Sequence, residues 1–409
     1  MAFAAPMILP SRLFGDDAPG RKITLGCIGV GTHGTGVNLK TFLAQPDARV
    51  LAVCDVFTSR RDNALAMVNK TYGNQDCRAV ADFREILADK SIDAVVISTP
   101  DHWHVPMSLM ALAAGKDVFC EKPTLTIDQG RELVQAVAKH KAVFQTGLED
   151  RSLARYHRVA ELVRNGVIGT LRAIKVGLPS GKLFAKEAAV APPADLDYNL
   201  WLGPAPFQPY SPNRVSTNGW RMIRDYSGGT LTDWGAHLVD TAMVGNGSEK
   251  SGPVEVEGTG TVPPDALNDV PMDFKLRYRF ANGVTMDVAG GGVLIRFEGD
   301  KGYLGIGGWD GNYEASDLAL FRTKIPAESN TFRQRPAGEH RNFLDCVRTR
   351  AATTYPAEDL HRLSTALHLG ALSIQLGRKL HWNPETESFA NDPAADALRS
   401  RPARQWQTA

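Results

Sequence analysis

The chain has 409 residues, of which 43% are hydrophobic and 22% are charged, as in an ordinary globular protein of two or three domains. The 46 Lys and Arg residues nearly balance the 45 Asp and Glu residues, and the net charge of +1 gives no indication of nucleic-acid binding. The sequence contains no apolar run of about 18 residues, so we predict no membrane span. The five cysteines form no CxxC pair, which argues against a disulfide framework or a zinc site.

The first 20 residues match no element of a compact fold. The short apolar stretch from Ala2 to Leu9 is followed by Pro10, Ser11 and Arg12, which is the form of the end of an export leader. This interpretation predicts an N-terminal arm over 1–21 and a periplasmic or exported protein. The alternatives are a disordered arm or a native start, and with them a cytoplasmic protein.

Between residues 22 and 147, strands and helices alternate. Apolar, strand-like runs lie at 23–28, 49–54, 94–98, 117–120 and 142–146. Segments with helical spacing lie at 35–44, 60–70, 105–114 and 126–140. Strict alternation with buried strands predicts an α/β domain with a parallel sheet that is covered on both faces.

After residue 147 the pattern changes. A helix is expected at 152–165, and strand-like runs then follow one another at 171–178, 254–262, 274–280, 284–289, 293–298 and 302–306. Asn282-Gly283 separates two of these runs and is typical of a hairpin turn. We therefore predict an α+β second domain over 148–380 with a mostly antiparallel sheet, a helix at 358–377, and an extended tail over 381–409.

A glycine-rich turn follows the first strand. Gly29, Gly31 and Gly34 have GxGxxG spacing, which allows a tight turn and a close approach of a pyrophosphate to a helix N-terminus. Asp55 ends the second strand, where an acid accepts both ribose hydroxyls and repels a 2′-phosphate, so we predict NAD rather than NADP. A turn without a nucleotide is the alternative. Neighbouring residues expected at the cofactor are Thr32, His33, Val56 and Arg60, although Arg60 and Arg61 would be compatible with NADP.

Two further segments follow parallel strands at their carboxyl ends, where ligands bind in such sheets. They are Thr99-Pro-Asp-His-Trp-His104 and Glu121-Lys122-Pro123. The Lys122 ammonium can stabilise a developing alkoxide, although an isolated Lys is more often a solvated surface residue. His102 and His104 lack a neighbouring Cys or carboxylate cluster, so we predict no metal site, and we expect His104 to contact the cofactor ribose or its neighbours. The cofactor-binding residues expected here are Thr99, Pro100, Asp101, His104, Glu121 and Lys122, together with Asp150 after the last strand.

A second group of chemistry-bearing residues lies on a helix. Asp233, His237 and Asp240 are spaced i, i+4 and i+7 and project from one helical face. An imidazole oriented by a carboxylate suits proton abstraction from an alcohol. The alternative is an N-cap Asp233 and a buried, hydrogen-bonded His237.

Aromatic and polar residues near this helix suit sugar recognition, which uses ring stacking and paired hydrogen bonds to vicinal hydroxyls. An Arg–Asp pair among them is equally compatible with a structural ion pair. The residues expected at the substrate are Trp220, Arg221, Arg224, Tyr226, Asp233 and His237, together with Arg151 and Tyr156 after the last strand of the first domain.

These motifs at this spacing resemble the glucose–fructose oxidoreductase/inositol dehydrogenase/MocA family over about residues 22–380. The resemblance implies an NAD-binding Rossmann domain over 22–147 and an α/β domain whose large sheet lines the substrate cleft and often builds a homo-oligomer (dimer or tetramer) interface. It also implies Lys122, Asp233 and His237 as the catalytic set, with His237 as the general acid/base. Glu149-Asp150 departs from the amide or basic residues that the family often carries there, which leaves the polarity of the substrate open.

Three functions are compatible with these motifs. The first is an NAD-dependent oxidoreductase acting on a secondary hydroxyl of a sugar, cyclitol or glycoside. The second is a glycosidase that recycles NAD through transient C3 oxidation, elimination and re-reduction; relatives of that type commonly lack the Lys, so Lys122 favours the first. The third is a non-catalytic NAD-binding regulator, against which the intact triad argues. Periplasmic members of the family carry an arm that covers the cofactor of a neighbouring subunit, and residues 2–20 are a candidate for the same role.

Overall fold

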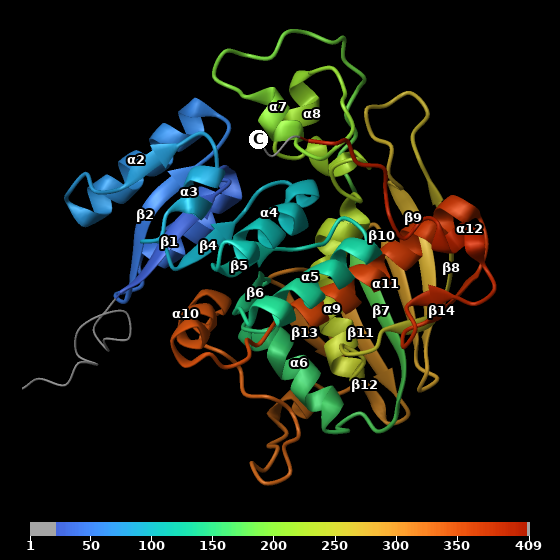
Figure 1. Ribbon diagram of the computed structural model, residues 1–409. Helices are drawn as coiled ribbons and strands as arrows, with labels where there is room; N and C mark the ends of the chain where they lie inside the picture. The colour runs from blue at the N-terminus through green and yellow to red at the C-terminus, as the bar shows by residue number, and fades with distance from the viewer. Residues whose placement is uncertain (1–21, 407–409) are drawn as a thin grey trace, which may run out of the picture.

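The computed structural model describes residues 22–406 (Figure 1). The N-terminal arm over 1–21, and with it the export prediction, lies outside the described residues and stays a prediction. Within residues 22–406, no helix is long and apolar enough to cross a bilayer.

The first sheet has six parallel strands in the order β3-β2-β1-β4-β5-β6. Its strands are β1 (Ile23–Ile28), β2 (Ala48–Cys54), β3 (Arg78–Val80), β4 (Ala94–Ile97), β5 (Asp117–Glu121) and β6 (Phe144–Gly147). Every residue of β4, β5 and β6 is buried, as expected for a sheet covered on both faces. The predicted α/β fold of this half is confirmed, and β3 is an edge strand that the sequence analysis missed.

The connections of this sheet are helical. They are η2 (Gly34–Leu39) continuing into α1 (Lys40–Leu43), α2 (Thr58–Tyr72), α3 (Arg84–Ala88), α4 (Asp101–Ala113) and α5 (Ile127–His140). Helix α4 begins at Asp101 rather than at Val105, because Pro100 is extended and Asp101 places an acid in the first turn. His102 and His104 therefore lie on a helix and not in a loop.

The second sheet has nine strands in the order β13-β12-β11-β7-β10-β9-β8-β14-β15. All its neighbouring strands are antiparallel except β7 and β10, which confirms the predicted mostly antiparallel sheet. Its strands are β7 (Leu171–Leu178), β8 (Pro253–Thr261), β9 (Asp273–Phe280), β10 (Thr285–Gly290), β11 (Leu294–Gly299), β12 (Gly302–Gly307), β13 (Asn312–Ala315), β14 (Leu380–Asn383) and β15 (Ser388–Phe389).

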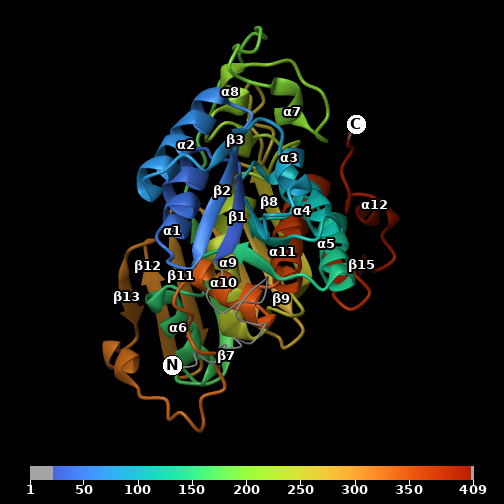
Figure 2. The ribbon, with the colours of Figure 1, turned by 60° about the vertical axis from the view of Figure 1, so that its left-hand side comes forward.

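The end of the chain differs from the extended tail that the sequence led us to expect. Strand β14 pairs with β8 and lengthens the large sheet, and α12 (Pro393–Asp396) follows β15. Beyond it, Arg404 donates to the carbonyl oxygens of Gly203 and Asn199, and Trp406 contacts Trp103. The tail thus runs past α5 and α4 toward α7 (Tyr198–Leu202), as Figure 2 shows.

Helices cover one face of the large sheet. They are α6 (Ala154–Arg164), α9 (Thr230–Asn246) and α11 (Ala357–Leu376). Strand β9 alternates strictly between buried and exposed residues, so its other face is open in this chain. That outer face carries ion pairs such as Arg277 with Asp287. An oligomer built through this sheet stays a prediction.

Residues 179–229 form a cap over the carboxyl end of the first sheet. It contains α7, α8 (Pro212–Val215) and η3 (Trp220–Met222), and its own apolar cluster includes Tyr198, Trp201 and Tyr226. The backbone N–H of Thr58 donates to Asp195 O, which ties the cap to the start of α2. The cap therefore encloses the edge of the sheet at which ligands bind.

Helix α10 (Glu339–Thr349) lies late in the chain but packs against the first domain. Phe343 and Leu344 are fully buried in the cluster that includes Phe42 and Phe119. Helix α11 likewise packs along α5 (Figure 1). Helices from the second half of the chain therefore contribute to the apolar core of the first domain. This shared packing fixes the walls of the cleft between the two domains.

This packing predicts that Phe343→Ala destabilises the protein by about 3–5 kcal/mol, because it empties a fully buried ring site. The measurement is chemical denaturation followed by tryptophan fluorescence. Phe207→Ala is the matched control, since Phe207 is 66% exposed, and its cost should stay within about 0.5 kcal/mol. Equal costs for the two variants would contradict the assignment of α10 to the first-domain core.

Candidate active site

A cleft of about 360 Å³ lies where the first sheet, the cap and α9 meet. It brings most of the sequence-predicted site residues together. Those that line it are Gly29, Gly31, Thr32, His33, Gly34, Asp55, Val56, Arg60, Thr99, Pro100, Asp101, His104, Glu121, Lys122, Trp220, Arg221, Asp233 and His237. The glycine-rich turn and the predicted catalytic residues thus face one cavity.

The glycine-rich turn is sterically fixed. Gly29 has φ of 84°, and a Cβ on it would lie 2.7 Å from the Ser98 carbonyl carbon. A Cβ on Gly34 would lie 2.0 Å from the Gly29 carbonyl oxygen. A Cβ on Gly31 would have only the Arg60 guanidinium nearby, at 3.4 Å, so the space beside Gly31 is open to a ligand. This cradle fits a dinucleotide pyrophosphate, which needs bare backbone at a helix start.

Asp55 lies at the end of β2, in the position expected for a ribose-binding acid. Its Oδ1 accepts the Phe57 backbone N–H at 2.9 Å, and burial raises the pKa of its carboxyl group. The Arg60 guanidinium stacks 4.0 Å from the Phe57 ring centroid and lines the cleft. Arg61 instead donates to the backbone oxygen of Asp55. Of the two arginines, only Arg60 is placed to meet a 2′-phosphate.

Glu121 is held ionised beneath the turn. Its Oε1 lies 2.9 Å from His33 Nε2 and accepts Asn38 Nδ2 at 2.8 Å. Burial alone would raise the pKa of Glu121, but His33, Asn38 and the Lys122 charge hold it at about 2. His340 of α10 contacts Asn38 Oδ1 at 2.8 Å. Asn38 and His340 were not among the predicted site residues, since no motif marks them.

Lys122 and Asp233 form a buried ion pair between the domains. Lys122 Nζ donates to Asp233 Oδ1 at 2.7 Å, and Arg221 Nε lies 3.2 Å from Asp233 Oδ2. Burial opposes both charges, yet each partner favours the other's ionised form. The pKa of Lys122 is therefore raised and that of Asp233 lies well below its usual range. Lys122 is a cationic hydrogen-bond donor in this site, and neither residue is poised to exchange a proton near neutral pH.

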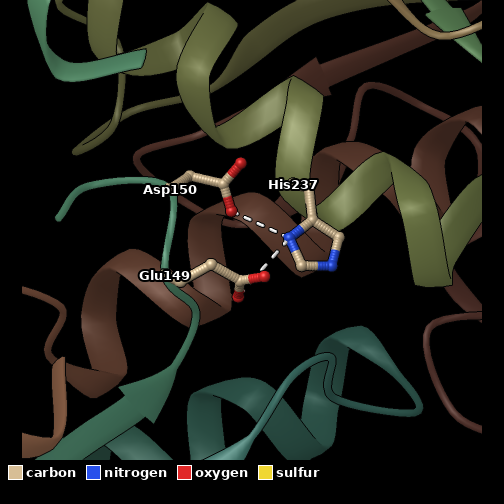
Figure 3. A group of neighbouring side chains, drawn as sticks. All are labelled: Glu149, Asp150 and His237. Carbon is tan, nitrogen blue, oxygen red and sulfur yellow. Dashed lines mark hydrogen bonds and ion pairs between the residues drawn. The ribbon is translucent and has the colours of Figure 1, made fainter. Parts of the chain in front are cut away.

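His237 is the group poised for proton exchange. Figure 3 shows Asp150 and Glu149, from the loop after β6, directed at one ring nitrogen of His237. Asp150 Oδ2 lies 2.8 Å from Nδ1, and Glu149 Oε2 lies 3.9 Å from it. The 2.8 Å distance fits an N–H···O hydrogen bond, which leaves Nε2 directed away from both carboxylates.

The surroundings of the His237–Asp150 pair raise the pKa of both groups. Burial and the Lys122 charge oppose the imidazolium, but Asp150 and Glu149 raise the pKa of His237 above its usual value. Burial raises the pKa of Asp150 to about 6. Asp150 was expected at the cofactor; it lies behind His237 instead, because the loop after β6 turns it away from the cleft. Ligand atoms of Glu149, Asp150 and His237 lie within 4.8 Å of one another, and we interpret them as an acid/base group rather than as metal ligands.

Three tryptophans form an aromatic wall of the cleft. They are Trp220 of the cap, Trp234 of α9 and Trp309 after β12. The Trp309 ring lies 5.0 Å from the His237 ring, and Tyr156 donates from its hydroxyl to Trp309 O at 2.9 Å. Trp309 was missed, since only the fold brings residue 309 to this point. The wall offers apolar faces next to the charged groups.

Several predicted substrate residues do not reach the cleft. Arg151 is buried in ion pairs with Asp240 and Asp359, and neither Arg151 nor Asp240 lines the cleft. Tyr156 is buried behind Trp309, and Tyr226 is buried within the cap against His102 and Trp201. Arg224 lines a second cavity. The sequence placed these residues near the site, but it did not predict which way their side chains turn.

The two histidines of α4 bond to backbone carbonyl oxygens. His104 Nδ1 lies 2.8 Å from Pro123 O and its Nε2 lies 2.9 Å from Thr99 O, so neither ring nitrogen is free for the ribose expected there. His102 Nε2 donates to Trp201 O, and burial lowers its pKa to about 4. Asp101 accepts the Ser227 hydroxyl at 2.6 Å. The start of α4 therefore anchors the cap.

A nucleotide cradle at the carboxyl end of a parallel sheet, next to an ionised pair between Lys122 of the first domain and Asp233 of the second, is the arrangement typical of two-domain NAD-binding oxidoreductases. Residues 23–148 match the family model described as "Oxidoreductase family, NAD-binding Rossmann fold". Residues 159–408 match "Oxidoreductase family, C-terminal alpha/beta domain". The chain belongs to the glucose–fructose oxidoreductase/inositol dehydrogenase/MocA family, and its NAD-binding Rossmann domain is the one that the motifs predicted.

Relatives with assigned names are similar to part of the chain. A glycosyl hydrolase family 109 protein of Stenotrophomonas maltophilia is 31% identical over 50% of this chain and 45% of its own length. The D-glucoside 3-dehydrogenase of Escherichia coli is 31% identical over 40% of this chain and 47% of its own length. The chain thus spans less than half the length of these relatives. The WlbA dehydrogenase of Bordetella pertussis, solved with NADH and UDP-GlcNAcA, has the same fold, with a TM-score of 0.66 and 17% identity over 88% of this chain and 98% of its own.

The position of Asp55 predicts that Asp55→Asn weakens NADH binding about tenfold, because a charged acceptor for the ribose hydroxyls is lost. The affinity for NADPH should fall less, because Arg60 remains and the repulsion between Asp55 and a 2′-phosphate is removed. Fluorescence titration with both cofactors measures this. Asp62→Asn on the exposed face of α2 is the matched control, and an equal loss in both variants would contradict the role of Asp55.

The His237–Asp150 contact predicts that Asp150→Asn lowers the pKa of His237, because the carboxylate that favours the imidazolium is gone. The neutral fraction of His237 at pH 7 should then rise. Titration of the His237 ring signals by NMR measures the midpoint. Glu149→Gln should produce a smaller shift, since Glu149 is farther away and 39% exposed. An unchanged midpoint in Asp150→Asn would contradict the pairing.

Proposed function

We propose that this enzyme is an NAD-dependent dehydrogenase that moves a hydride between nicotinamide and a secondary hydroxyl-bearing carbon of a sugar, cyclitol or glycoside. The observation that carries the proposal is the shared cleft: Lys122, Asp233 and His237 line it together with the glycine-rich turn, and Asp150 contacts His237 from behind. An alcohol oxidation needs such an arrangement, because one group must take the hydroxyl proton while another stabilises charge on the oxygen.

The roles of the residues follow from their protonation states. Lys122 is cationic and donates a hydrogen bond to the substrate oxygen, which favours the developing alkoxide. Asp233 fixes the position of Lys122 through their ion pair. Arg221 contacts Asp233 and lies over the Trp220 ring, which positions Trp220. His237 takes the hydroxyl proton at Nε2, and Asp150 holds Nδ1–H and stabilises the resulting imidazolium. The bound NAD, held by Gly29, Gly31, Gly34 and Asp55, supplies the hydride acceptor.

A carbohydrate or polyol substrate is supported by the lining of the cleft. Trp220, Trp234 and Trp309 offer apolar faces to the C–H side of a ring, and Arg221 and Glu149 offer polar groups to hydroxyls. The names of the relatives point the same way, since they include a D-glucoside 3-dehydrogenase and glycosyl hydrolases.

A glycosidase that oxidises and re-reduces its sugar with one NAD is the second candidate. It is favoured by the relatives named glycosyl hydrolase family 109 and by Glu149, an unassigned carboxylate in the cleft. Elimination needs a base for the carbon next to the ketone. Glu149 is 39% exposed, and its ion-pair partner among residues 22–406 is His237, at 3.9 Å. The presence of Lys122 favours the dehydrogenase.

The proposal predicts that Lys122→Met lowers turnover about 100-fold or more while NADH affinity changes little. The assay follows absorbance at 340 nm with NAD and a panel of aldoses, inositols and glucosides. Lys324→Met, at an exposed position, is the matched control and should keep full activity. If no member of the panel reduces NAD with the wild-type enzyme, the dehydrogenase proposal fails.

The same preparation separates the two candidates. A chromogenic glycoside with NAD far below the substrate concentration releases its chromophore only if the cofactor is recycled in each turnover. Release without net NADH, abolished by Glu149→Gln, would favour the glycosidase. Stoichiometric NADH without release supports the dehydrogenase.

A further inference from the structure

A second cavity lies outside the active site. It encloses about 290 Å³ between the start of α5, the second half of α11, the end of β8 and the C-terminal tail. It shares no lining residue with the cleft. Its apolar walls are formed by Leu125, Ile127, Val262, Val270, Leu372 and Ile374. This volume and lining suit part of a small organic molecule.

Three guanidinium groups line the same cavity: Arg224, Arg399 and Arg401. Arg401 donates to the carbonyl oxygens of Arg224 and Ser227, at 2.5 and 3.0 Å, and makes no ion pair within residues 22–406. The Arg224 side chain makes neither a hydrogen bond nor an ion pair within the described chain. Its bonds are those of its backbone, with the N–H donating to Asp269 Oδ1 and the carbonyl oxygen accepting from Arg401. Arg399 Nε is buried without a hydrogen-bond partner in the described part of the chain. Arg399 pairs with Asp128 at 3.2 Å, so the cations of this cavity that have no ion pair among the described residues are Arg224 and Arg401.

A single carboxylate of the described lining, Asp269, lies beside Arg224 and Arg401, and burial raises its pKa. His368 donates from Nε2 to Thr124 O and stays neutral, because burial and the Arg401 charge lower its pKa to about 3. Burial and Arg224 lower the pKa of Arg401 to about 10. A desolvated cation beside a like charge is unfavourable unless an anion is present.

We propose that this cavity is a second ligand site, for a small amphipathic anion. A carboxylate or phosphate head pairs with Arg224 and Arg401, whose planar guanidinium groups suit both heads. An apolar body lies against the wall formed by Val262, Val270 and Leu372. Arg224 and Gly228 of this site follow the active-site residues Trp220 and Arg221 within a few positions of the chain.

Isothermal titration calorimetry on the full chain saturated with NADH tests the proposal. Saturating NADH keeps the probe out of the nucleotide cradle. The probes are phenyl phosphate and benzoate, with inorganic phosphate and phenol as comparisons. We expect saturable one-to-one binding of at least one aromatic anion, weaker binding of inorganic phosphate, which lacks the apolar body, and none of phenol, which lacks the charge. Binding is read directly, so the result is independent of the enzyme's substrate.

Two variants locate the site. Arg224→Gln and Arg401→Gln should each weaken binding of the aromatic anion at least tenfold. Arg224→Gln removes a side chain without bonds to other described residues, so it should keep the melting temperature even if Arg401→Gln lowers it. Arg322→Gln, at an exposed position by the opposite edge strand β13, is the matched control and should bind normally. Absence of saturable binding up to about 10 mM, or unchanged affinity in both cavity variants, would overturn the proposal.

Discussion

The buried ion pair between Lys122 and Asp233 is the interaction on which the cleft depends. Lys122 follows β5 of the first domain and Asp233 lies in the first turn of α9 of the second, and their side chains are 10% and 21% exposed. Removing either partner would leave an uncompensated buried charge, which costs several kcal/mol. The pair therefore joins the two domains at the point where the reaction would occur. Arg221 extends the pair to the cap, so three parts of the chain meet at one carboxylate.

Environment gives the acidic residues of this site different states. Asp233 faces two cations and is held ionised, whereas Asp150 is buried behind His237 and its pKa rises to about 6. The first arrangement keeps a fixed charge, and the second provides a group that exchanges a proton near neutral pH. The division assigns electrostatic stabilisation to Lys122 and proton transfer to His237. It also explains why a lysine with a raised pKa cannot itself be the base.

Local patterns predicted the fold and much of the cleft because they act over short stretches of chain. Glycine spacing, the acid after β2 and the buried strands placed Gly29, Gly34 and Asp55 correctly, since sterics at a strand–helix turn leave few alternatives. Side-chain direction in irregular segments was not predictable. Asp150 and Arg151 are adjacent, yet one reaches His237 and the other pairs with Asp240 and Asp359. Trp309 and His340 reach the site only through long-range packing, which no local pattern records.

A crystal structure of the complex with NADH tests the central claim most directly. The account predicts that the nicotinamide ring lies in the cleft with its reactive carbon facing the space between Lys122 Nζ and His237 Nε2, while the adenosine ribose bonds to Asp55. A nicotinamide ring bound away from both side chains, or Lys122 and His237 turned into separate cavities in the complex, would contradict it.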